Sequence, residues 1–225
     1  MDLDPAFIRH GLIIFILLAI SVVFHDWAQA MTAHLLGDDT PKADGRVSLN
    51  PLAHMDLFGT VVFPFVYIFL FGANLLVFGY GRPIRINSAN FRNRRRDELL
   101  VVLSGPAMNL VLAFVAVLLG SFVVVSYPVF IELVQALVVM NVGLAVFNLL
   151  PIPPLDGGWA LKIVAGMSEE TYLLISRWSW LLMLLLYRIP LVQEIIGLLI
   201  GLALRPFGLL CNAINPTAYL IIFRS

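Results

Sequence analysis

Long apolar stretches alternate along this chain with short polar segments. Taken as helices, the apolar stretches predict membrane segments over residues 7–36, 57–80, 99–126, 129–150 and 178–204. A helix needs about 20 mostly apolar residues to cross the hydrocarbon core of a bilayer, and each of these ranges is long enough. We therefore expect an all-α membrane protein, a polytopic transmembrane helical bundle with about five or six membrane segments.

The last part of the chain is less regular than the rest. Arg188 and Pro190 interrupt the range 178–204, so this range forms either one kinked span or two half-spans. The tail over residues 206–225 is almost uncharged but contains Pro216. It either lies along the membrane interface or packs as a last membrane segment, and the sequence leaves both possibilities open.

Positive charge is concentrated between the second and third apolar stretches. Residues 81–98 hold six arginines against two acidic residues. Because short loops rich in lysine and arginine stay on the cytoplasmic side, we expect the loop 81–98 in the cytoplasm. Residues 129–150 then end at the cytoplasmic face. If the first span also ends there, residues 57–80 do not make a simple single crossing, so we expect a re-entrant or loop region after the first span.

Composition agrees with a membrane protein and argues against other classes. Hydrophobic residues make up 60% of the chain, charged residues only 12%, and the mean hydropathy is +0.95, whereas soluble domains carry about 25% charged residues. A formal net charge of zero gives no support for nucleic-acid binding. Cys211 is the single cysteine, which excludes internal disulfides and cysteine-based metal sites. No linker divides the chain, so we expect one integral membrane domain over residues 1–225.

Three segments place polar groups at membrane depth: FHDWAQA (24–30), SGPAMN (104–109) and NLLPIPPLDGG (148–158). A charged group inside a bilayer costs roughly 2.5–3.5 kcal/mol, so His25, Asp26 and Asp156 need partners. One interpretation is a polar network that only joins helices, and the glycine and proline of SGPAMN could simply permit close packing. The proline-rich PIPPLDGG favours a functional site, because it predicts a rigid extended segment and then a turn that carries a carboxylate.

Together these segments resemble the site-2 protease family of intramembrane zinc metalloproteases, compact bacterial branch. The similarity runs from about residue 7 to 204 and includes the stretches 35–60 and 82–106. It implies a bundle of the site-2 protease core type in the bacterial inner (cytoplasmic) membrane. The family binds zinc through an H-E-x-x-H motif on a helix and a later Asp-Gly motif.

Carried over by position, the resemblance implies His25 and Asp156 as zinc ligands. Asn148 matches an asparagine that positions substrate or the tetrahedral intermediate. Asp26 stands where the family has its general base, a glutamate, and Gln29 stands where it has the second histidine ligand.

Both departures weaken the case for hydrolysis. The Asp26 side chain is shorter than glutamate by about 1.5 Å, and a misplacement of about 1 Å can lower a rate about 10²-fold. Gln29 offers a neutral amide, whereas zinc sites use Cys, His, Asp or Glu. His54 is the best substitute ligand among the other histidines.

From these departures the sequence predicts a catalytically degenerate homologue, a pseudoprotease without a bound cofactor. It would act as a structural or regulatory subunit of a membrane assembly, with other membrane subunits, transmembrane helices and lipid as its partners. The alternative is an active zinc metalloprotease that cleaves transmembrane segments near the cytoplasmic face. A third hypothesis is an ion or proton pathway through His25, Asp26 and Asp156. Zinc content would separate the first two.

Overall fold

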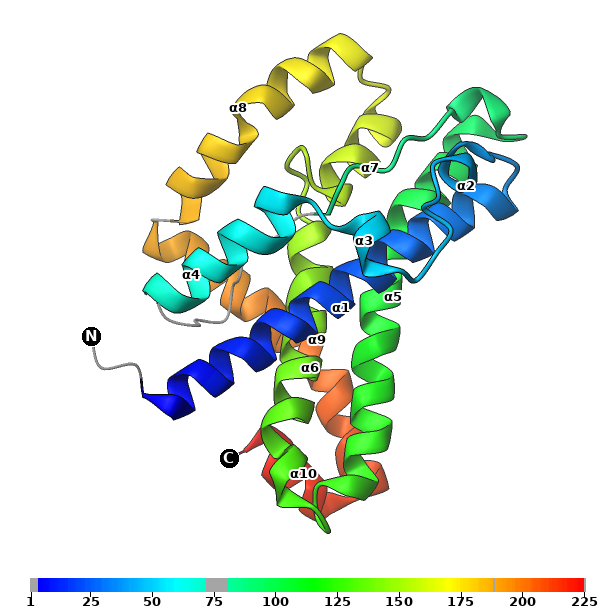
Figure 1. The fold of residues 1–225 in the computed structure, drawn as a ribbon. Coiled ribbons are helices and arrows are strands. Elements are labelled where there is room, and N and C mark those ends of the chain that lie inside the picture. The colour runs from blue at the N-terminus through cyan, green and yellow to red at the C-terminus, as the bar shows by residue number, and fades with distance from the viewer. Residues whose placement is uncertain (1–3, 72–80, 188, 225) are drawn as a thin grey trace.

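The fold is built from helices (Figure 1). The computed structural model describes residues 4–71, 81–187 and 189–224, and these residues contain no strand, so the expectation of an all-α fold is confirmed for them. The elements are α1 (Pro5–Leu35), α2 (Thr40–Ala43), α3 (Pro51–His54), η1 (Leu57–Val62), α4 (Phe63–Phe71), η2 (Ser88–Asn90), α5 (Arg94–Val123), η3 (Pro128–Phe130), α6 (Ile131–Asn148), α7 (Asp156–Ala165), α8 (Glu169–Tyr187), α9 (Pro190–Ile214) and α10 (Pro216–Phe223).

Four of the described helices are long and apolar enough to cross a membrane. They cover Pro5–Leu35, Arg94–Val123, Pro128–Asn148 and Pro190–Ile214. α5 packs against both α1 and α6, and α9 packs against α5 and α6. Figure 1 shows α1 crossing α5 and α6, with α8 set apart from them. These contacts bring the first and third polar segments of the sequence to the same part of the bundle.

Local sequence explains where the two longest helices begin. α1 starts with a proline, and the Asp4 carboxylate in front of it accepts a hydrogen bond from Ala6 N at 3.0 Å. At the start of α5, the Asn93 side chain accepts from Arg96 N at 3.1 Å, and the Asp97 carboxylate accepts from Asn93 N at 2.9 Å. Side chains at both starts therefore satisfy amides that have no partner within the helix.

The range 57–80 is helical in its described part. η1 and α4 continue into each other, and the apolar helix over Leu57–Phe69 is shorter than the four candidate spans. Residues 72–80 lie outside the described part of the chain. The expected re-entrant character of this range therefore stays a prediction.

The C-terminal part of the chain divides between Tyr187 and Pro190. The range 178–204 falls on two helices, because α8 ends at Tyr187 and α9 begins at Pro190. α9 then continues through Pro206 to Ile214, past the approximate span end at 204, and α10 follows from Pro216. Burial explains the continuation. Cys211 is fully buried in a cluster with residues of α5, α6 and α10, and this packing offsets the backbone hydrogen bond that a proline inside a helix removes.

Candidate functional site

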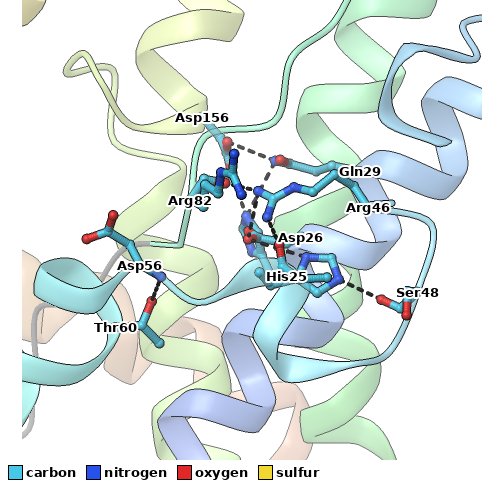
Figure 2. Close-up of polar contacts among 11 residues, drawn as sticks. His25, Asp26, Gln29, Arg46, Ser48, Asp56, Thr60, Arg82 and Asp156 are labelled. Carbon is cyan, nitrogen blue, oxygen red and sulfur yellow. Dashed lines mark hydrogen bonds and ion pairs between the residues drawn. The ribbon is translucent and has the colours of Figure 1, made fainter. Parts of the chain in front are cut away.

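Three polar side chains from two helices meet at one point (Figure 2). His25 and Gln29 lie one turn apart on the same face of α1, and Asp156 is the first residue of α7. His25 Nε2 lies 3.0 Å from Asp156 Oδ2, and Gln29 Nε2 donates to Asp156 Oδ1 at 2.9 Å. The two α1 side chains are themselves 3.4 Å apart, from Gln29 Nε2 to His25 Nε2. The predicted approach of His25 and Asp156 is thus confirmed.

The glycines after Asp156 explain how α7 reaches this point. A Cβ on Gly157 would overlap the carbonyl groups of Leu149 and Leu150, and a Cβ on Gly158 would overlap the backbone of Pro153. Only glycine permits so close an approach. The Asp-Gly-Gly sequence therefore lets α7 start directly against the turn that follows α6, with the Asp156 carboxylate directed at α1.

α5 forms the wall behind the three side chains. A Cβ on Gly105 would lie 2.6 Å from His25 Cε1 and 2.8 Å from Gln29 Nε2, closer than ordinary contacts allow. One turn later, Asn109 Nδ2 lies 3.3 Å from His25 Nδ1. Gln29 Nε2 also approaches the backbone carbonyl of Val102, at 3.3 Å. The SGPAMN segment thus serves both close packing and the polar contacts of His25.

The Asp26 carboxylate faces a second cluster. Its Oδ2 atom lies 3.9 Å from the Arg46 guanidinium and 3.8 Å from His54 Nδ1. Gly81 also lies against it, because a Cβ there would lie 3.1 Å from Asp26 Cγ. The position at which the family has its general base is therefore occupied by a buried carboxylate beside a buried cation.

Arg46 and His54 tie this second cluster together. Arg46 is only 3% exposed, and its guanidinium donates to the carbonyls of Ala53 and Arg82. His54 Nε2 lies 2.6 Å from Ser48 O, and Arg82 N donates to His54 O at 2.8 Å. Burial lowers the pKa of the Arg46 guanidinium below its ordinary value, against the opposing effect of the Asp26 charge. One guanidinium thus joins the 46–54 loop, the start of the arginine-rich loop and α1.

The other predicted site residues, His54 and Asn148, make no recorded contact with His25 or Asp156 among the described residues. The ring of His54 contacts Asp26 and Ser48. Asn148 Nδ2 donates to Leu144 O in its own helix at 3.0 Å. Sequence reasoning missed Arg46 as part of the site, and no pattern in the sequence marks it. Asn109 ends the SGPAMN segment that the sequence singled out, but no contact with His25 was predicted for it.

Zinc, which the resemblance implies, is bound in proteins by Cys, His, Asp or Glu side chains. No group of three or more His, Cys, Asp or Glu side chains able to hold a metal occurs in the part of the chain that the structure describes. The side-chain tips of His25, Gln29 and Asp156 nevertheless lie 2.9–3.4 Å apart. This is close to the spacing of about 3.3 Å between ligands of tetrahedral zinc. His25 and Asp156 are zinc ligands of the usual kinds, whereas Gln29 presents its amide nitrogen here and would have to contribute its carboxamide oxygen instead.

Comparison with known proteins gives consistent matches. Residues 123–186 match Peptidase family M50. The chain is 38% identical over 154 residues to "Putative zinc metalloprotease YwhC" of Bacillus subtilis, a match that covers 63% of this chain and 64% of that protein. It is 31% identical over 176 residues to "Putative zinc metalloprotease Rip2" of Mycolicibacterium smegmatis, covering 76% and 64%.

The Mycobacterium tuberculosis protein of the same name matches over 146 residues at 31% identity, covering 64% of this chain and 53% of that protein. The chain thus spans just under two thirds of the length of the first two relatives and about half of the third. No solved structure matches the chain significantly. The family match covers Asp156, so this part of the chain is similar to Peptidase family M50, and the chain as a whole is similar to relatives named as putative zinc metalloproteases.

Proposed function

We propose that this chain is a zinc-dependent intramembrane protease that cleaves transmembrane segments of other membrane proteins. The observation that supports it is the convergence of His25 and Gln29 from α1 with Asp156 from α7, at mutual distances of 2.9–3.4 Å. The names of the relatives favour this function over the degenerate homologue that the motif departures predict.

The side chains of the proposed site divide into zinc ligands and a proton acceptor. His25 Nε2, a carboxylate oxygen of Asp156 and the Gln29 carboxamide oxygen would hold the zinc ion. The Gln29 oxygen takes the place of Nε2 when the carboxamide turns by 180°, an exchange that hardly alters its shape. When bound, zinc supplies a Lewis acid that polarises the scissile carbonyl and activates water. Asp26, whose Oδ2 atom lies 3.9 Å from the Arg46 guanidinium, would accept a proton from the water.

The surroundings fit a substrate inside a membrane. α1 is one of four helices long and apolar enough to cross a bilayer, and the site lies past its midpoint, toward the arginine-rich loop. That loop is predicted to be cytoplasmic from its charge, which puts cleavage near the cytoplasmic face of a bacterial inner membrane. The organisms of the matched relatives are bacteria.

The degenerate homologue remains a second candidate because of one contact. Gln29 Nε2 donates to Asp156 Oδ1 while His25 faces the other carboxylate oxygen. In this arrangement the three side chains contact one another without a cation, and the contact joins α1 to α7 as a structural network. The same fold would then hold a partner helix as a subunit of a membrane assembly.

Zinc stoichiometry and cleavage of a transmembrane reporter together test the proposal. Wild-type protein purified in mild detergent with zinc should hold about one zinc per chain, and Asp156→Asn should lose it. Gln29→His, which restores a usual ligand, should bind zinc more tightly and cleave faster. His10→Gln is the matched control, because His10 bonds Glu132 on α6 instead of the site. A zinc-free, inactive wild type, together with recovery of both properties in Gln29→His, would establish the second candidate.

A further inference from the structure

Arg205 is a charged residue near the middle of an apolar helix. α9 is one of the four helices long and apolar enough to cross a membrane, and Arg205 lies three residues past its midpoint and nine before its end. At 1.5 Å per residue, the nearer end of α9 is about 13.5 Å away. Before Arg205, Ile200 shares an apolar cluster with Val142 of α6. After it, Cys211 shares one with Val138 of the same helix. Arg205 is therefore carried at the depth of the middle of α6, well inside the candidate spans.

This charge has no partner within the described part of the chain. Arg205 is exposed, and no hydrogen bond or ion pair joins it to another described residue. A charged side chain inside a membrane segment is costly, and such residues almost always face the interior of a bundle or pair with another group. Because Arg205 does neither among the described residues, its partner is to be sought on another molecule.

The face of α9 that carries Arg205 is open. Glu194, Gly201 and Arg205 are seven and four residues apart, so they lie along one side of the helix. All three are exposed, and a Cβ on Gly201 would meet no atom within 4 Å. α9 is also the least covered of the four candidate spans, since 22% of its most apolar stretch is buried, against 33–44% in the others. The open face thus has room for the backbone of another helix to approach closely.

We propose that this face of α9 binds a transmembrane helix of another protein, and that an acidic side chain of that helix pairs with Arg205. Charge distinguishes this occupant from a second copy of the chain. A dimer through this face, with its twofold axis along the membrane normal, would place the two Arg205 side chains beside each other. Depth distinguishes it from lipid, because lipid phosphates lie at the membrane surface and Arg205 does not. A carboxylate within the membrane, by contrast, meets the guanidinium where the low dielectric constant strengthens their attraction.

The experiment measures energy transfer in phosphatidylcholine vesicles between the donor-labelled full-length protein and acceptor-labelled peptides. Each peptide is a leucine-rich transmembrane helix with a glutamate, an arginine or a further leucine at its centre. The glutamate peptide should associate about 5–30-fold more tightly than the leucine peptide, the range expected for a polar contact between membrane helices. Arg205→Leu should abolish this preference, and Arg205→Glu should transfer it to the arginine peptide. Arg177→Leu, which removes an exposed arginine of α8, is the matched control and should keep the preference for glutamate.

Three results would overturn the inference. Equal association of the glutamate and leucine peptides with wild type would show that Arg205 recruits no acidic helix and would leave lipid as its partner. A preference for glutamate that survives in Arg205→Leu would place the contact elsewhere on the chain. Energy transfer between differently labelled wild-type copies, lost in Gly201→Leu, would assign the face to a second copy.

The inference depends on neither zinc nor hydrolysis, so it and the proposed function can fail separately. Zinc binding should be the same in Arg205→Leu as in wild type, because Arg205 takes no part in the His25–Asp156 site. If the leucine variant does not fold, the exchange of preference in Arg205→Glu decides the question. A charge-reversed variant that folds but gains no preference for the arginine peptide would contradict the pairing.

Discussion

The indole N–H of Trp159 donates to the Glu98 carboxylate at 2.9 Å, from α7 to the first turns of α5. Glu98 is buried, and Trp159 follows Asp156 by three residues on the same short helix. Because α7 has only ten residues, a fixed point this close to its start also fixes the direction of the Asp156 carboxylate. The bond therefore links the wall of the site to the residue that meets His25.

Trp159→Phe should loosen α7. The substitution keeps an aromatic ring but leaves the Glu98 carboxylate buried without its donor, a loss of about 1–3 kcal/mol. We expect a lower thermal midpoint and weaker zinc binding. Glu170→Gln on α8 is the control, because Glu170 is exposed. An unchanged midpoint in Trp159→Phe would show that the bond does not hold α7 in place.

Gly105→Ala should disturb the site without removing any polar group. The added Cβ would lie 2.6 Å from His25 Cε1 and 2.8 Å from Gln29 Nε2, so α1 and α5 must separate or the side chains must turn away. We expect loss of most of the zinc bound per chain. In Gly201→Ala, by contrast, the new Cβ meets nothing within 4 Å, and that variant should be as stable as wild type or more so. Equal zinc content in the two variants would contradict the packing described for Gly105.

Asp38 should make the protein sensitive to acid. Burial alone would raise its pKa, but hydrogen bonds from Thr40, Asn87 and Asn90 outweigh burial and hold the pKa below its ordinary value. A lowered folded pKa adds stability that is present above the unfolded pKa of about 3.9 and is lost as the pH falls through the folded pKa. When the thermal midpoint is measured at decreasing pH, starting from neutral, it should therefore begin to decrease once the pH is lower than about 4.

Asp38→Asn tests whether this residue is responsible. The variant cannot accept all the hydrogen bonds that reach Asp38, so it should be less stable than wild type at neutral pH. Its midpoint should also change less with pH in the acid range. Glu170→Gln, which alters an exposed carboxylate, should follow the wild-type curve. Parallel curves for wild type and Asp38→Asn would remove Asp38 from the explanation.

The sequence predicts the helical class for a clear physical reason, because apolar length defines candidate spans. The meeting of His25 with Asp156 is instead what the family resemblance implies. The sequence does not predict that Pro206 lies inside α9, because the burial of Cys211 that stabilises this helix is a tertiary contact. Arg46 escapes prediction for the same reason. Its partners Asp26, Ala53 and Arg82 come from three separate segments.

Arg46→Met should be strongly destabilising, although the two side chains are similar in length. The guanidinium is buried, bonds two backbone carbonyls and lies 3.9 Å from Asp26 Oδ2. Removing one partner of a buried ion pair leaves the other charge uncompensated, at a cost of about 3–5 kcal/mol. We expect a large fall in the thermal midpoint. Arg85→Met, which removes an exposed arginine paired with Asp44, is the control and should change the midpoint little.

The double variant Asp26→Asn/Arg46→Met separates the ion pair from the backbone bonds. If the uncompensated Asp26 charge causes most of the loss, neutralising it should restore much of the midpoint. If the bonds to Ala53 and Arg82 dominate, the double variant should be as unstable as Arg46→Met alone, and Arg46→Lys should rescue poorly because it lacks the planar guanidinium that reaches both carbonyls. Additive losses from the two single substitutions would show that Arg46 does not stabilise the Asp26 carboxylate, and the part given to Asp26 in hydrolysis would lose its support.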